Sequence, residues 1–413
     1  MVSLARKNLL EDIPRFLVAQ AGIMFAVSLV TIQTGIFNGF TRSTAKLIDN
    51  SSADIWVASD SLVHVELTLP IPLTHVIQSQ QVAGVERAEA LNVRGAVWRH
   101  SQGEITPVRV IGFDPNGQLF APKNIIQGSL IALKQPYTVM VDATNLNSLN
   151  VQRVGDVAEV GSLPARVVSL TQKNRSIASN PFMFTSLENA NAYSTSGQTS
   201  SLSCKTQSGS TDIKCTNTYV KPDPASTPTP KKLSASDAIT FVLIRAKPGQ
   251  DLEALKQRLE AVLPNTHAYT SEELADKTQT FWRRRTGIGF ILGLGAAVGV
   301  IVGAIIVGQI LYSSVSDHLN EFGTLKAMGA SDWVIYGVIV EQALWMAILG
   351  YVPGMVLCFG VGAWTYATQG IMILITPVTA IGVLGITVSM CVGSAIFAIQ
   401  KVTRVDPAIV FKA

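Results

Sequence analysis

Four long stretches of uncharged, apolar residues constrain this chain more than any other feature. One lies near the start, from Phe16 to about Phe37, and three follow Arg285. About 20 apolar residues in a helix are enough to cross the hydrocarbon core of a bilayer. No Asp, Glu, Lys or Arg occurs between Gln342 and Gln400, whereas charges are frequent between Glu86 and Arg285. The sequence therefore predicts four membrane crossings and a large segment that folds in water.

Composition agrees with this mixture and excludes several functions. The chain has 413 residues, a mean hydropathy of +0.33 and 15% charged residues. Its net charge of +4 comes from scattered cations, with no basic stripe of the kind that binds nucleic acid. No segment fits G-x-x-x-x-G-K-[ST], so we expect ATP and Mg to be bound by a partner and no cofactor by this chain. We also find no catalytic set and no Cys/His spacing typical of zinc, so we expect neither a catalytic nor a metal site.

The predicted fold is an α-helical membrane bundle of four helices joined to an α+β extracytoplasmic domain. We expect this layout: a short amphipathic helix on the cytoplasmic face (1–14), the first span (15–38), the extracytoplasmic domain (39–270), a stalk helix leading into the second span (271–312), a cytoplasmic coupling segment (313–332), the third span (333–363), a short external loop (364–377), the fourth span (378–400) and a cytoplasmic tail (401–413).

Charge around the spans sets the expected orientation. Four crossings place both ends of the chain on one side, and cations flank both ends: Arg6, Lys7, Arg15, Lys401, Arg404 and Lys412. Lys and Arg favour the cytoplasmic side. Arg283, Arg284 and Arg285 disagree because they precede the second span on the side that we assign as external. The rule is weak beside long translocated domains, so the orientation is kept.

The extracytoplasmic segment shows strand and helix patterns near both ends. We expect strands at 53–59, 85–93, 108–113, 137–141, 166–170 and 238–246, and helices at 73–81 and 251–262. A last helix begins near Ser271, where SEEL resembles a capping box, and we expect it to run unbroken into the second span as a rigid lever. The alternative is a break at the arginine triplet.

Small and polar residues mark the spans themselves. Glycines recur at four-residue spacing in two series within the second span. One series is Gly289 and Gly293, and the other is Gly295, Gly299 and Gly303. Such patterns serve either a dimer interface or tight packing within one chain, and both interpretations stay open. Glu341 is the only charge within the third span, and we expect it to have a structural role, protonated or hydrogen-bonded to a neighbour such as Gln309.

The segment between the second and third spans is charged and amphipathic. Leu319, Phe322, Leu325 and Met328 fall on one helical face, and Gly329 is placed to end the helix. We expect this face to dock into a soluble partner, with interfacial lipid contact as the alternative. Elsewhere, Cys204 and Cys215 lie in a Ser/Thr-rich loop and either form a disulfide or remain two free thiols.

The run QILYSSVSDHLNEFGTLKAMGAS resembles the cytoplasmic coupling region of MacB/FtsX-type ABC-transporter permeases, as a variant of E-[IF]-G-x-L-[KR]-A-[ML]-G-A. Within that group the chain is most similar to cyanobacterial DevC-type exporter permeases, through AQAGIMFAVSLVTIQTG, GFILGLGAAVGVIVGAIIVGQILYSSVSDHL and TLKAMGASDW. The resemblance covers the membrane regions and the flanks of the external domain.

This resemblance implies a homodimeric permease in the bacterial inner membrane, with an extracytoplasmic domain of the MacB periplasmic-core type. That domain would have porter-like flanks at about 50–120 and 236–270 and a variable middle at about 121–235. It also implies a separate ABC ATP-binding subunit that contacts Asp317, His318, Leu319, Asn320, Glu321, Phe322, Thr324, Leu325, Lys326, Met328 and Gly329.

Further implied partners are a periplasmic membrane-fusion adaptor and a TolC-like outer-membrane channel, with a glycolipid or another amphiphile as cargo. The alternatives are an FtsX-like signalling protein that regulates a cell-wall hydrolase, or a lipoprotein-release permease. We expect replacement of Glu321, Phe322 and Leu325 to uncouple ATP hydrolysis from export while leaving membrane insertion intact.

Overall fold

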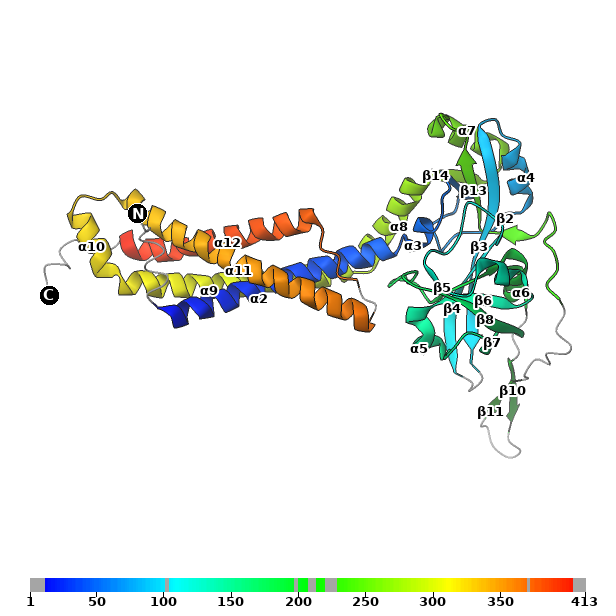
Figure 1. Ribbon diagram of the computed structural model, residues 1–413, viewed down its shortest axis with the longest axis horizontal. Coiled ribbons are helices and arrows are strands. Elements are labelled where there is room, and N and C mark those ends of the chain that lie inside the picture. Colours follow the sequence, from blue (N-terminus) through cyan, green and yellow to red (C-terminus); the bar gives the residue numbers. More distant parts are fainter. Residues whose placement is uncertain are drawn as a thin grey trace. The chain divides into compact units, whose positions relative to one another are not determined.

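The computed structural model describes residues 12–100, 104–196, 200–206, 213–219, 229–369 and 372–403 (Figure 1). The chain divides into two compact units. One consists of Met1–Phe40 with Thr286–Ala413, and the other of Thr41–Arg285. The predicted amphipathic helix at 1–14 and the tail at 401–413 fall largely on residues that this description does not include.

Among the residues that the structure describes, four helices are long and apolar enough to cross a membrane, as predicted. They are α2 (Ile13–Ser43), α9 (Ile288–Asp317), α11 (Asp332–Gln369) and α12 (Pro377–Thr403). A short helix, α10 (Leu319–Ala327), separates α9 from α11.

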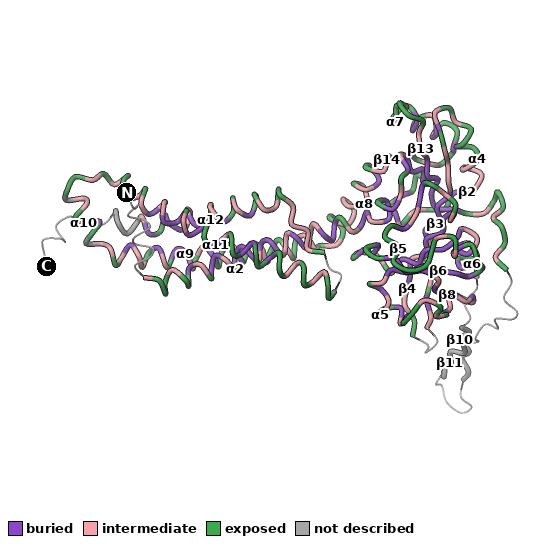
Figure 2. Tube along the Cα trace, in the orientation of Figure 1, coloured by how far each residue is buried: buried purple, intermediate pink, exposed green. Residues whose placement is uncertain are grey.

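We call the unit of Met1–Phe40 with Thr286–Ala413 the membrane unit. One apolar cluster holds its four long helices together. Ile23 and Val27 of α2, Leu311 of α9, Ile339 of α11 and Cys391 of α12 all belong to it and are buried. Many large apolar side chains on the same helices are exposed instead, and burial alternates along each helix (Figure 2). Exposed apolar faces of this extent are expected for helices that contact lipid.

The third span is longer than predicted. Because α11 continues to Gln369, Trp364 and Tyr366 lie on the helix, and the prediction that the external loop begins at residue 364 is wrong. Pro353 is accommodated within the same helix. After α11, the Leu374 N–H donates to the Gly35 carbonyl oxygen of α2 at 2.9 Å. A Cβ on Gly39 would lie 1.9 Å from the Met372 oxygen, so the connection between the last two spans packs directly on the backbone of α2.

The predicted continuous lever is broken. Helix α8 (Ser271–Arg285) ends at the arginine triplet, and α9 begins at Ile288. Between them, Gly287 has a φ of +62°, a left-handed conformation that side chains disfavour and that ends a helix. At its start, α8 has a capping box one residue earlier than expected: the Glu273 N–H donates to Thr270 Oγ1 and the Thr270 N–H to Glu273 Oε2.

The second unit is built on a ten-stranded mixed sheet. Its order is β14-β1-β13-β3-β4-β9-β6-β8-β5, with β7 pairing both β3 and β8. The pairs β4 with β9 and β6 with β8 are parallel, and the other pairs are antiparallel. The strands are β1 (Ile55–Ser59), β3 (Val85–Arg99), β4 (Ile105–Phe113), β5 (Ile125–Gln127), β6 (Thr138–Asp142), β7 (Val157–Val160), β8 (Leu163–Thr171), β9 (Phe182–Ser186), β13 (Phe241–Ala246) and β14 (Thr266–Thr270).

Two small sheets and several helices complete this unit. The small sheets are β2 (Ile71–Pro72) with β12 (Ala238–Ile239), and β10 (Ser200–Thr206) with β11 (Ile213–Tyr219). The helices, besides α8, are α3 (Lys46–Asp49), α4 (Thr74–Gln80), α5 (Leu146–Leu149), α6 (Leu187–Thr195) and α7 (Leu252–Val262), with the 3-10 turns η1 (Leu130–Lys134) and η2 (Ala143–Asn145).

One predicted strand is divided in two. The segment 238–246 forms β12 and β13 because Thr240 lies between them. Its hydroxyl accepts from the Val93 N–H at 2.8 Å and its N–H donates to the Leu91 oxygen at 3.0 Å. The side chain thus takes a place in the ladder with β3. The helix predicted at 251–262 is confirmed as α7, with the Asp251 carboxylate capping it through the Glu253 N–H at 3.0 Å.

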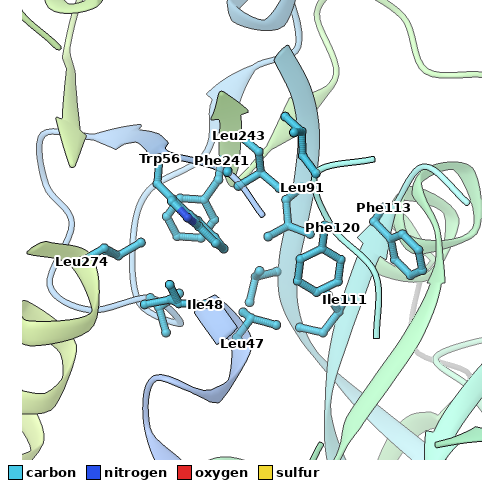
Figure 3. Packing of buried hydrophobic residues seen from close by; sticks show 14 of the residues in the cluster. Leu47, Ile48, Trp56, Leu91, Ile111, Phe113, Phe120, Phe241, Leu243 and Leu274 are labelled. Atoms are coloured by element: carbon cyan, nitrogen blue, oxygen red, sulfur yellow. The ribbon is translucent and has the colours of Figure 1, made fainter. Parts of the chain in front are cut away.

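The apolar core beside α8 joins both ends of this unit's sequence. Trp56, Phe241 and Leu91 pack together there, with Leu274 of α8 on one side and Phe120 on the other (Figure 3). Trp56 and Phe241 meet edge to face, with their ring centroids 5.2 Å apart. Since Leu274 is fully buried, the first turn of α8 is fixed to the sheet.

Candidate coupling sites

The first candidate site is α10, which follows α9 directly. Phe322 is 2% exposed and belongs to the apolar cluster of the membrane unit, and Leu325 packs against that cluster. The expectation that this apolar face has only a partner or lipid to bury against is therefore wrong, since it packs on the chain's own helices. Phe322 anchors α10 and does not offer itself to another protein.

The opposite face of α10 is exposed. Glu321, Thr324 and Met328 are spaced by three and four residues, so they share one side of the helix. Met328 is 72% exposed, and the prediction that it shares the apolar face of Phe322 is wrong. Past the helix, Gly329 takes a φ of +93° and ends it as predicted. Trp333 follows, 81% exposed, with its ring 6.0 Å from that of Tyr336. We call the surface of Glu321, Thr324 and Met328 the foot face.

Ion pairs link α10 to α11 and the end of α9 to α2. Lys326 Nζ lies 3.0 Å from Asp332 Oδ1 at the start of α11. At the end of α9, Asp317 pairs with Arg15 of α2, which also contacts Asp12 at 2.9 Å. Exposed pairs like these add little stability each. Together with buried Phe322, however, they give the helix a defined position on the bundle.

The glycine series of α9 packs mainly within the chain. A Cβ on Gly295 would meet Gln33 at 2.3 Å, one on Gly299 would meet Leu29 at 2.8 Å, and one on Gly303 would meet Ala26 at 2.7 Å. These three glycines therefore allow α9 to approach α2 closely. Gly289 faces Phe37 at 3.0 Å, whereas Gly293 has nothing within 4 Å.

The predicted polar pair in the spans does not form. Gln309 is exposed on α9, and in the part of the chain that the structure describes no hydrogen bond joins it to Glu341. The deeply buried amide is the next residue, Gln342, which is 1% exposed and whose Oε1 lacks a hydrogen-bond partner. Gln342 continues the buried stripe of Ile335, Ile339 and Met346, and this periodicity was the signal that could have identified it.

The second candidate site is a polar cluster beside α8, which no pattern in the sequence predicts. The segment 60–68 follows β1 and lies against α8, where the Val65 N–H donates to Thr278 Oγ1 at 3.2 Å. The His64 ring stacks on Phe281, with centroids 4.7 Å apart, and lies 5.5 Å from Trp282. Two successive residues of this segment are thus fixed to the helix.

The same segment is tied to the sheet through Glu66. Its carboxylate, whose side chain is 8% exposed, lies 3.0 Å from Arg109 Nε of β4 and accepts from Ser179 Oγ at 2.7 Å. Ser179 precedes β9, so three parts of the domain meet at one carboxylate. We call His64, Glu66, Arg109, Ser179 and Thr278 the stalk joint.

Burial sets the protonation behaviour of the stalk joint. It lowers the pKa of His64 to about 4, with a further contribution from the positive charge of Arg109. Burial also raises the pKa of Glu66, a change that the hydrogen bond from Ser179 and the Arg109 charge oppose. His64 is therefore neutral near neutral pH and acts as an aromatic packing group.

Two family models match the chain. The model of the MacB-like periplasmic core domain covers residues 16–262, and that of the FtsX-like permease C-terminal region covers 293–407. The chain belongs to the MacB/FtsX-type ABC-transporter permeases. This confirms the predicted family and the predicted fold class.

Curated relatives agree with this assignment. An uncharacterized ABC transporter permease of Mycobacterium tuberculosis is 23% identical over 397 residues, which cover 95% of this chain and 94% of that protein. A probable export ATP-binding/permease protein of Pseudomonas fluorescens is 22% identical over 56% of this chain, and the macrolide export ATP-binding/permease protein MacB of Nitrobacter winogradskyi is 24% identical over 37%. The matches span only 31% and 24% of the length of these two relatives.

Two solved structures are also similar to this permease. The periplasmic region of MacB from Actinobacillus actinomycetemcomitans aligns with a TM-score of 0.32 and 7% identity, covering 58% of this chain and 97% of that one. The extracellular domain of the transporter YknZ from Gram-positive bacteria aligns with a TM-score of 0.34 and 10% identity, covering 52% and 99%.

Proposed function

We propose that this permease is the transmembrane subunit of an ABC exporter that transmits motion from a separate ATP-binding subunit to its extracytoplasmic domain. The observation that carries the proposal is the division of α10 into two faces. Phe322 fixes one face to the spans, while Glu321, Thr324 and Met328 present the other face outward. Because α10 is packed on the spans, a movement that a bound partner imposes on α10 can be transmitted to the spans.

In this proposal both termini and α10 are cytoplasmic, and the unit Thr41–Arg285 is periplasmic. ATP and Mg are bound by the partner, and no catalytic step belongs to this chain. Motion reaches α8 through the two residues that separate it from α9. The stalk joint then passes a change in α8 to β4 and to the segment before β9, because Glu66 and Thr278 connect these elements.

The proposed assembly is a homodimer with an adaptor and a TolC-like channel. The exposed apolar side chains Phe290, Ile291 and Ile301 of α9 offer a surface for a second copy. Relatives are named for the export of macrolides and of syringafactin, the latter in Pseudomonas syringae. We propose an amphiphile, a glycolipid among the candidates, as the cargo class.

Coexpression with the cognate ATP-binding subunit tests the foot face. Charge reversal in Glu321→Arg, combined with Met328→Glu, should abolish copurification of the ATP-binding subunit and stimulation of its ATPase. Val378→Ala, a change at an exposed apolar position of α12, is the control and should retain both. Undiminished binding by the double variant would contradict the proposed docking site.

The extracytoplasmic partner distinguishes export from signalling. Crosslinking in intact cells should capture an adaptor and a TolC-like channel on the domain Thr41–Arg285. Capture of a cell-wall hydrolase without an adaptor would instead favour an FtsX-like regulator, and release of lipoproteins that stops when the permease is depleted would favour a lipoprotein-release permease.

A further inference from the structure

Two cysteines face each other in the small sheet of β10 and β11. The strands pair antiparallel, and Cys204 is the direct partner of Cys215 in their register. These strands form a sheet of their own, separate from the ten-stranded sheet (Figure 1). Their spacing in the sequence does not place the two cysteines close together, whereas the strand register does.

The register fits the geometry of a disulfide. Directly opposed residues of an antiparallel pair have Cα atoms about 4.5 Å apart at non-hydrogen-bonded positions and about 5.5 Å at hydrogen-bonded ones. Disulfides span Cα separations of about 4.4 to 6.8 Å. Either class of position therefore allows the bond, and facing residues lie on the same side of the sheet.

The composition of the β10–β11 hairpin also favours such a bond. An isolated two-stranded hairpin is marginally stable in water at best. The strand sequences SSLSCKT and IKCTNTY supply few apolar side chains, and Lys205 faces Lys214, a like-charge pair that disfavours this register. Linking the strands at Cys204 and Cys215 would limit the freedom of the unfolded hairpin and fix the pairing.

The other two cysteines have a different environment. Cys358 on α11 and Cys391 on α12 are buried in the membrane unit as free thiols. They give an internal reference for reduced cysteine in the same chain.

We propose that Cys204 and Cys215 form a disulfide that staples the β10–β11 hairpin. The inference rests on the proposed periplasmic position of the domain, since disulfides persist in oxidising compartments. The bond forms by exchange with a disulfide-bearing thiol oxidoreductase. The two thiols lose two protons and two electrons and become one S–S bond, while the S–S bond of the oxidant breaks and takes up those electrons and protons as two thiols.

Differential alkylation of the full-length protein from membranes tests the staple. Free thiols are blocked in denaturant, the protein is reduced, and newly exposed thiols are labelled with a heavier reagent before peptide mass spectrometry. Cys204 and Cys215 should carry the heavy label and Cys358 the light one. Reduction should also raise the rate of trypsin cleavage at Lys205 and Lys214 several-fold, a change that Cys204→Ser should reproduce without reductant.

Failure of the disulfide can be separated from failure of the orientation. The Cys204→Ser variant leaves Cys215 as the single cysteine of the unit Thr41–Arg285, which a membrane-impermeant maleimide should label in cells with a permeabilised outer membrane and an intact inner membrane. If the wild-type cysteines carry the light label and Cys215 is labelled from outside, the staple is refuted and the orientation stands. If Cys215 reacts only after the inner membrane is opened, both the staple and the proposed orientation are refuted.

Discussion

At the scale of single residues, side chains that are close in sequence have opposite roles. On α10, Phe322 is buried in the bundle and Met328, six residues later, is exposed. In the stalk joint, Glu66 and His64 lie two residues apart, and burial shifts their pKa values in opposite senses, upward for the acid and downward for the base. Both shifts disfavour the charged form, as expected for groups held in an apolar setting.

Replacing Phe322 should affect folding, whereas replacing Met328 should affect coupling. Phe322→Ala should destabilise the membrane unit by about 3 to 5 kcal/mol, because it leaves a cavity in the apolar cluster. Met328→Ala should leave the thermal unfolding temperature in detergent unchanged and lower the transport-coupled ATPase activity. Thermal unfolding and ATPase assays on both variants check this separation. Equal loss of stability in the two variants would contradict the two-faced helix.

His64 should make the extracytoplasmic domain sensitive to acid. Its pKa is about 4 in the folded domain and about 6.5 when unfolded, so the unfolded state binds the proton first as pH falls. Stability from this group is complete above pH 6.5 and is lost toward pH 4. Lowering pH from 7 to 5 should therefore cost about 2 kcal/mol.

His64→Phe tests this dependence because it keeps an aromatic ring against Phe281 and removes the titration. Glu66 has a raised pKa in the folded domain, so its contribution to stability falls as pH rises above its pKa in the unfolded state. Both the wild type and His64→Phe contain Glu66. Denaturant unfolding at pH 5 and pH 7 gives the comparison. If the two proteins lose the same stability on acidification, His64 is not the buried neutral group described here.

At the scale of elements, the close contact of α9 with α2 depends on glycine. A side chain at Gly299 would collide with Leu29, while one at Gly293 would meet open space. The break between α8 and α9 depends on another glycine, Gly287, through its backbone conformation and not through lack of space. Glycine is therefore required at Gly299 because there is no space for a side chain, and at Gly287 because the backbone is left-handed.

Gly299→Leu should separate α9 from α2 and destabilise the membrane unit by about 1 to 3 kcal/mol, the usual cost of overpacking. Gly293→Leu is the matched control on the same helix and should be close to neutral. Thermal unfolding of both variants in one detergent provides the measurement. A larger loss for Gly293→Leu would place the tight interface on the other side of α9.

Gly287→Ala should disfavour the left-handed turn between α8 and α9 by about 1 to 2 kcal/mol. We expect normal insertion and binding of the ATP-binding subunit but reduced export, since the joint carries motion to α8. Gly249→Ala, at a left-handed glycine shortly before α7 with open space around it, is a control for the cost of strain alone. Unchanged export in Gly287→Ala would show that the turn has no part in transmission.

At the scale of the whole molecule, pattern in the sequence predicted the larger features. Long uncharged runs predicted four spans, and the motif around Leu325 predicted the family, because both signals are local. The stalk joint could not be predicted, since it joins residues as distant as Glu66, Ser179 and Thr278. The break between α8 and α9 was only the alternative prediction, because Gly287 precedes a helix-favouring apolar run, and only the backbone conformation decides such cases.

The central claim is that ATP binding by the subunit docked on the foot face changes the structure of the stalk joint. Hydrogen–deuterium exchange of residues 60–68, in the permease reconstituted with its ATP-binding subunit, measures this most directly. The account predicts that ATP with Mg alters exchange in this segment of the wild type and leaves it unaltered in the Glu321→Arg, Met328→Glu variant. An identical change in both proteins, or none in the wild type, would contradict it.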